Sequence, residues 1–166
     1  MRCQVKRLNR VVLMLVIIYA VGLTGCSAYA DFVVINASDS SIDITYKVKK
    51  STVGRLVASG PPAVIEVSQL STRGGTAWEQ LNSGDYRLSE EPEVDVVSVQ
   101  LPSQHALRLT SLRLESASSQ DSKGFPITEI VITGPNGKSG FSGDRARTGF
   151  SELSRSLYAI TYKFVK

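Results

Sequence analysis

The chain has 166 residues, about one domain's worth, and is long enough to bury a core without metal or disulfide staples. Its formal net charge of +4 resides in the N-terminal leader, because residues 1–25 hold four Lys and Arg side chains and no Asp or Glu. From residue 26 onward, the other 15 basic side chains balance the 15 acidic ones. We therefore expect no nucleic-acid partner, since phosphate binding needs a surplus of Lys and Arg on one face.

The leader has the layout of a signal peptide. Residues 1–10 are positively charged, and the next thirteen, VVLMLVIIYAVGL, carry no charge. An apolar run of this length matches a signal-peptide core and is short for a helix that spans a bilayer, although an uncleaved anchor is an alternative. Both cysteines, Cys3 and Cys26, lie in or beside this leader. The rest of the chain therefore has no disulfide, zinc cluster or cysteine nucleophile.

The leader ends with Leu23, Thr24, Gly25 and Cys26, which match all four positions of a lipobox. In this the chain resembles bacterial membrane lipoproteins. The resemblance implies cleavage after Gly25, diacylglycerol on the Cys26 sulfur and commonly a further acyl chain such as palmitate on its amino group. Cys26 is thus the expected lipidation site, and membrane lipid is the expected partner through it. In a cell with two membranes, Ser27 after the cysteine favours the outer membrane, facing the periplasm.

A second cleavage site competes with the lipobox. Ala28, Tyr29 and Ala30 form a small-x-small pattern that an ordinary signal peptidase could cut, releasing a soluble chain that begins at Asp31. We favour the lipobox, because a four-position match directly after the apolar run is much rarer than an A-x-A pattern. The expected organisation is a signal peptide over residues 1–25, a lipidated tether over 26–30 and one domain over 31–166.

The mature chain is dominated by strand patterns. Alternation of apolar and polar residues predicts half-buried strands over residues 42–49 and 158–164. Short β-branched runs bounded by Gly, Pro, Ser and Asn predict further strands over residues 31–36, 63–67, 94–101 and 127–133. Some seven to nine strands without crossover helices predict an all-β, antiparallel, two-sheet sandwich of immunoglobulin-like type, with a small barrel as the alternative.

Three local features refine the predicted fold. In HALRLTSLRL the leucines change parity, so one extra residue near Thr110 and Ser111, a β-bulge, would place them all on one side. GPNGK at residues 134–138 predicts a hairpin turn with a left-handed Gly137. TGFSELSRSL at residues 148–157 is the best helical candidate, with Ser151 as a cap.

Residues that could perform chemistry are few. His105 is the only histidine, in a polar turn before a strand, and we expect no catalytic or metal-binding role because it has no His or Cys partner. Glu90, Glu91, Glu93 and Asp95 are too irregularly spaced for a calcium loop, so we expect a solvated loop before a strand at Val94.

Basic, glycine-containing and aromatic segments are the other candidates. We expect Lys138, Arg145 and Arg147 to be ordinary loop charges, and TRGGTAW and SGFSGDRARTG to be plain connections. Six aromatic residues could form a stacking surface for a ligand, but we expect most of them in the core, with Trp78 between the sheets; they are Trp78, Tyr86, Phe125, Phe141, Phe150 and Tyr158.

The sequence therefore predicts a lipid-anchored, non-catalytic binding or assembly module of the cell envelope, with no cofactor, no metal and an envelope protein as the candidate partner. Pairing along a strand edge is its simplest binding mode. The alternative is a periplasmic or secreted ligand-binding protein, or a small envelope enzyme, released by cleavage after Ala30.

Overall fold

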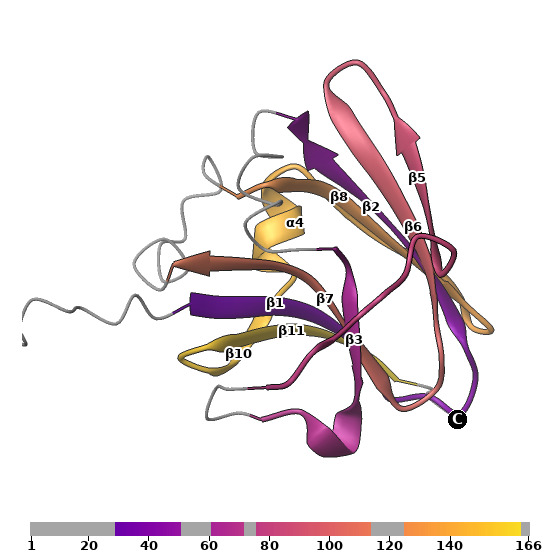
Figure 1. The fold of residues 1–166 in the computed structure, drawn as a ribbon, viewed down its shortest axis with the longest axis vertical. Coiled ribbons are helices and arrows are strands. Elements are labelled where there is room, and N and C mark those ends of the chain that lie inside the picture. The colour runs from indigo at the N-terminus through magenta and orange to yellow at the C-terminus, as the bar shows by residue number, and fades with distance from the viewer. Residues whose placement is uncertain (1–28, 51–60, 72–75, 114–124, 164–166) are drawn as a thin grey trace, which may run out of the picture.

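A computed structural model describes residues 29–50, 61–71, 76–113 and 125–163, which form two β-sheets packed face to face (Figure 1). Sheet A has the strand order β10-β11-β1-β7-β3-β4, and sheet B has the order β5-β6-β2-β8-β9. The strands of sheet A are β1 (Tyr29–Asn36), β3 (Ala63–Glu66), β4 (Glu79–Gln80), β7 (His105–Arg113), β10 (Ser151–Ser154) and β11 (Leu157–Tyr162). Those of sheet B are β2 (Ile42–Lys49), β5 (Tyr86–Glu90), β6 (Val94–Leu101), β8 (Ile127–Gly134) and β9 (Gly137–Ser142).

The predicted all-β sandwich is thus confirmed. All neighbouring strands are antiparallel except β1 and β11, which run parallel. The eleven strands in the described residues exceed the seven to nine expected, because β4, β5 and β10 are short and largely polar. No helix of the described residues has the length and hydropathy to cross a membrane.

The main core fills the space between the sheets. β2 shows how the sequence builds it, since Ile42, Ile44, Tyr46 and Val48 are buried while the residues between them face outward. The buried members of the main core are Ala30, Phe32, Val34, Ile42, Ile44, Tyr46, Val48, Val97, Val99, Leu101, Leu107, Leu109, Phe125, Ile127, Ile130, Ile132, Phe150, Tyr158 and Ile160.

A second, outer cluster covers the opposite face of sheet A. Its buried members are Val33, Ile35, Ile65, Ala106, Leu157 and Ala159, against which Ala37, Val67, Leu70 and Trp78 pack. The covering segment includes the short 3₁₀ helix η3 (Val67–Gln69). Because β1 is covered on both faces, its residues 32–35 are all apolar and buried, without alternation.

Trp78 belongs to this outer cluster, so the prediction that it lies between the sheets is wrong. It is only partly buried, and its indole Nε1–H donates to Asp31 Oδ2 at 2.9 Å. A buried indole needs a hydrogen-bond acceptor. The apolar core between the sheets offers no such acceptor to Trp78, whereas the Asp31 carboxylate lies on the outer face of β1.

The predicted bulge is present in β7. Phe32 pairs with Thr110 and Val33 pairs with Arg108, so Leu109 is the extra residue. This places Leu107 and Leu109 in the main core and lets Leu112 pack against it. The fourth leucine of the pattern, Leu114, lies outside the described residues.

The predicted hairpin joins β8 to β9, and Gly137 has a φ of 106°, in the left-handed region that favours glycine. The predicted helical turn around Ser151 is wrong, because this segment forms β10 and pairs with β11. The α-helix lies just before it, as the single turn α4 (Asp144–Thr148). Tertiary pairing has overridden the weak local capping pattern.

Candidate functional site

The expected lipidation site, Cys26, lies outside the described residues, three positions before β1 begins at Tyr29. The first strand therefore begins two residues before the domain boundary expected at Asp31. Ala30 is fully buried in the main core and pairs with Leu112 of β7. The first described strand thus lies close to the predicted anchor in the sequence.

His105 opens β7 at the turn that follows β6, and it is half-buried. Its Nδ1 lies 2.7 Å from the carbonyl oxygen of Ser103, so this ring nitrogen donates to the backbone of the turn. Within the described ranges, no three His, Cys, Asp or Glu side chains lie together as a metal site would require. The contact made by His105 is a structural one.

The acidic run lies between β5 and β6, with Glu90 ending one strand and Asp95 in the next, which begins at Val94 as predicted. Two lysines form ion pairs with this acidic run. Lys50 Nζ lies 3.9 Å from Glu90 and 3.8 Å from Asp95, and Lys47 Nζ lies 3.8 Å from Glu91. These partly exposed ion pairs each contribute little to stability, but they balance the negative charge locally.

The basic residues Lys138, Arg145 and Arg147 differ in their exposure to solvent. Lys138 and Arg145 are exposed, whereas Arg147 on α4 is 8% exposed. The Arg147 guanidinium carbon lies 4.8 Å from the ring centroids of both Phe32 and Tyr158. The three residues therefore form no common cationic surface.

Most aromatic side chains are core residues, as expected. Phe125, Phe150 and Tyr158 are buried and surround Phe32, with ring centroids 5.0–5.3 Å from it. Tyr86 and Phe141 pack partly buried against the same core. The aromatic residues proposed as a stacking surface are thus dispersed between the core and its margins.

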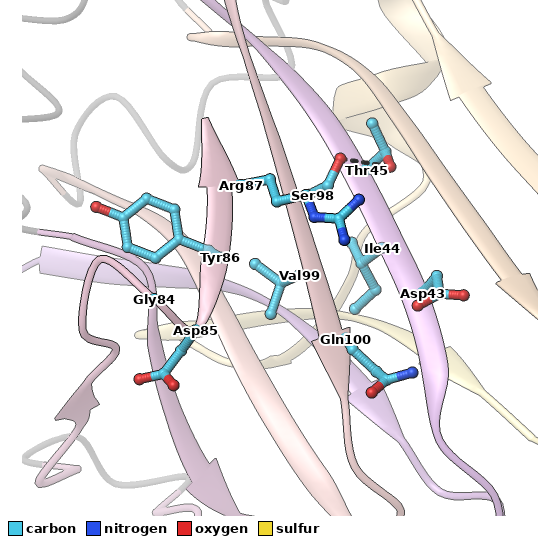
Figure 2. A pocket seen from close by; sticks show the side chains of 10 residues that line it. All are labelled: Asp43, Ile44, Thr45, Gly84, Asp85, Tyr86, Arg87, Ser98, Val99 and Gln100. Atoms are coloured by element: carbon cyan, nitrogen blue, oxygen red, sulfur yellow. Dashed lines mark hydrogen bonds between the residues drawn. The ribbon is translucent and has the colours of Figure 1, made fainter. Parts of the chain in front are cut away.

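A hollow of about 460 Å³ lies on the outer face of sheet B, over β5, β6 and β2 (Figure 2). Its charged side chains are Asp43, Asp85 and Arg87, and Arg87 extends from β5 across β6 (Figure 2). Thr45 Oγ1 and Ser98 Oγ lie on its floor, 3.0 Å apart in a hydrogen bond. Small-molecule sites are usually enclosed and mainly apolar, so this open, charged hollow is better suited to a polar segment of chain.

β5 forms one edge of sheet B, and half of its backbone groups have no strand partner among the described residues. The Glu91 N–H donates to the Val94 carbonyl oxygen at 2.9 Å, which marks these two residues as a hydrogen-bonded pair. Because such pairs alternate along an antiparallel ladder, Arg87 and Ser89 also bond to β6. The N–H and C=O groups of the three residues that alternate with these point away from β6; they are those of Tyr86, Leu88 and Glu90.

The two faces of β5 differ in chemistry. On the outer face, Arg87 borders the hollow. On the inner face, Leu88 pairs with Val97 and is 55% exposed, the highest value for a large apolar side chain in the described part of the chain. We call this combination of unpaired backbone, Leu88 and the hollow beside Arg87 the β5 edge.

The chain matches no protein-family model, no curated protein and no solved structure.

The geometry of the β5 edge therefore carries the functional argument. Its outward N–H and C=O groups can bond to an added strand, Leu88 can contact an apolar side chain, and Arg87 can pair with an acidic one.

Sequence reasoning did not identify this edge. β5 follows a turn at residues 81–85, in which the Asp85 N–H donates to the Asn82 carbonyl oxygen at 2.9 Å. The strand after it has a weak alternation of Tyr86 and Leu88 with polar residues, which was the available signal.

Proposed function

We propose that the protein is a bacterial lipoprotein, anchored by acylated Cys26, whose sandwich serves as a non-catalytic binding or assembly module of the cell envelope. The anchor is supported by the lipobox Leu23-Thr24-Gly25-Cys26 and by the start of β1 at Tyr29. Ser27 favours the outer membrane as its location.

The observation that carries the anchor is the burial of Ala30. Cleavage after Gly25 leaves β1 whole, whereas cleavage after Ala30 would remove Tyr29 and Ala30 from it. The chain would lose the pairing of these residues with β7 and a fully buried methyl group worth about 0.8 kcal/mol. It would also place a charged amino group on Asp31, whose N–H donates to the Ser156 carbonyl oxygen at 2.9 Å.

For the binding role, we propose that an extended segment of an envelope protein adds to sheet B along β5. Such a segment would bond to the outward backbone groups of Tyr86, Leu88 and Glu90. Its side chains would alternate between the two faces of the sheet. Those on one face would contact Leu88, and those on the other would contact Arg87 and enter the hollow. We therefore expect a partner segment with apolar residues on one face and an acidic residue on the other.

The other edges in the described residues are less suited to strand addition. β4 has two residues and β10 has four, too few for a stable added strand. β9 has six, but two of its central residues are Ser139 and Gly140, which offer little for a partner's side chains. Among these described edges, β5 joins outward backbone groups to an exposed apolar side chain and a hollow.

The alternative function, a released ligand-binding protein or enzyme, would use the same hollow through Asp43 and Asp85. Paired catalytic carboxylates need different environments, with one shielded from water to keep its proton. Both aspartates are exposed here. This arrangement favours binding over acid–base catalysis.

Mass spectrometry of the mature N-terminus tests the anchor. From native membranes we expect a chain that begins with acylated Cys26, and from Cys26→Ser we expect the uncleaved leader or a chain cut after Ala30. An unmodified wild-type chain beginning at Asp31 would refute the anchor. A membrane-bound mature form in Cys26→Ser would show that the lipobox is coincidental.

Photocrosslinking in cells tests the β5 edge, with the crosslinker at Arg87 and, as a matched control on another edge, at Lys138. We expect an adduct of defined mass from Arg87 that is lost in Leu88→Pro, because proline removes an N–H that the sheet itself does not use. Leu88→Ala keeps this N–H and should weaken the adduct less. An adduct from Lys138 alone, or one that persists in Leu88→Pro, would contradict pairing along β5.

Ser89→Pro provides the control for folding. The Ser89 N–H bonds to β6, so proline should disrupt this strand pair, whereas Leu88→Pro should unfold at nearly the wild-type urea concentration.

A further inference from the structure

Two exposed large apolar side chains, Tyr29 and Leu153, lie at one end of sheet A. Of the three large ones in the described residues, Tyr29 is 52% exposed, Leu153 is 48% exposed and the third is Leu88 on β5. Leu153 lies in β10, just before the turn at Arg155 and Ser156 that leads into β11. The Ser156 carbonyl accepts the N–H of Asp31, so this turn lies beside the start of β1.

The same end of sheet A holds the start of β1. Figure 1 shows the start of β1 and the β10–β11 turn together at the left of the molecule. Tyr29 is three residues from Cys26, and even a fully extended chain spans at most about 11 Å over that interval. The headgroup layer on each side of a bilayer is about 5–8 Å thick, so a lipid on Cys26 would hold this end at the membrane surface.

We propose that this end of sheet A rests in the headgroup layer of the membrane that holds Cys26. Tyr29 and Leu153 would contact lipid, and the exposed Arg155 would face lipid phosphates. We call these three residues the tether end. The inference rests on the proposed acylation of Cys26, which limits the distance between Tyr29 and the membrane.

The side chains of the tether end are suited to contact with lipid headgroups. Tyrosine is enriched at membrane interfaces because its ring is amphipathic, and arginine attracts anionic headgroups. The two nearest described acidic side chains are directed toward protein groups. Asp31 accepts hydrogen bonds from Trp78 and Ser111, and Glu152 lies 3.5 Å from the Tyr158 hydroxyl.

The proposed orientation directs the rest of the molecule away from the membrane. The β8–β9 turn contacts the far end of β11, since the Asn136 N–H lies 3.4 Å from the Tyr162 hydroxyl. Sheet B carries β5 on the side of the molecule opposite the start of β1 (Figure 1). The β5 edge would thus remain available to a partner.

The test uses the full lipidated protein in phosphatidylethanolamine–phosphatidylglycerol vesicles that contain brominated lipid. The described domain has no cysteine, so a single cysteine can carry a fluorophore at Leu153→Cys, with Leu88→Cys as the matched control of similar exposure. Asn136→Cys marks the far end. We expect brominated lipid to quench the label at position 153 and to leave those at positions 88 and 136 unchanged.

Quenching at position 88 or 136 equal to that at 153, or no quenching at 153, would overturn the orientation. The two proposals fail differently. If acylation is wrong, the protein lacks a modified Cys26 and does not float with vesicles. If only the orientation is wrong, an acylated, vesicle-bound protein shows no preference for position 153. Arg155→Cys provides a second label site at the tether end should Leu153→Cys fold poorly.

Discussion

At the residue scale, Arg147 is the one charged side chain that the described part of the chain buries. Its guanidinium lies over the faces of Phe32 and Tyr158, and its aliphatic stem fills space beside them. Burial lowers the pKa of Arg147, while Tyr158 and Glu152 act in the opposite direction. The residue thus joins α4 to the aromatic part of the main core.

Replacing Arg147 with alanine should lower the free energy of unfolding by about 2–4 kcal/mol, because packing and cation–π contacts are lost together. Arg145→Ala on the exposed side of the same helix should change it by about 0.5 kcal/mol or less. Arg147→Met, which refills the volume, should recover part of the loss. Urea unfolding measures all three, and equal effects of the two alanine variants would contradict the packing role.

Tyr46 makes stability depend on pH in the alkaline range. Burial in the main core raises its pKa above the ordinary value of 10.0, with the nearby Tyr86 acting in the same direction. The folded chain therefore keeps a proton that the unfolded chain loses, so the contribution is complete below about pH 10 and declines as pH rises above it. The expected slope is about 1.4 kcal/mol per pH unit for one proton.

Urea midpoints at pH 9 and pH 11 measure this dependence. Tyr46→Phe should decline less steeply between the two values than the wild type. Burial also raises the pKa of Tyr158, so some decline should remain in the variant. Equal slopes in the two proteins would show that Tyr46 ionises without unfolding.

At the element scale, the bulge in β7 keeps its leucines on one face despite a change of parity in the sequence. Leu109 is the extra residue and is 3% exposed, while its neighbours Arg108 and Thr110 pair with consecutive residues of β1. Removing Leu109 would therefore leave the neighbouring pairs in register.

Deleting Leu109 should cost about as much as Leu109→Ala, in the range of about 2–5 kcal/mol for a buried leucine. Deleting Leu107 should be far more damaging, because closing the gap through the bulge would turn Arg108 inward. Circular dichroism and urea unfolding distinguish these outcomes. Similar losses from both deletions would argue that the bulge does not absorb the change.

The elements also show how far the sequence predicts the fold. β2 and β6 begin and end where the patterns place them, because alternation and β-branching are local signals. β5 and β10 were missed because short polar edge strands take their structure from a neighbour. Trp78 was misplaced because a second cluster on the outer face of sheet A depends on how the chain folds over it.

At the scale of the whole molecule, the start of β1 and the β5 edge lie on opposite sides of a sandwich whose mature sequence has balanced charge. The anchor could be predicted because the lipobox is contiguous in the sequence. The β5 edge could not, because a strand is an edge only by virtue of the order in which all strands assemble. The hollow likewise combines residues of β5 and β6 with residues of β2, which lies far from them in the sequence.

The central position of β1 has a mechanical consequence. β1 lies between β11 and β7, and its first residue is the point at which an acylated Cys26 would transmit a pull from the membrane. A pull directed along β1 would load the hydrogen bonds to β11 and β7 together in shear and would not open them one after another. An anchor attached to an edge strand would instead peel that strand from the sheet.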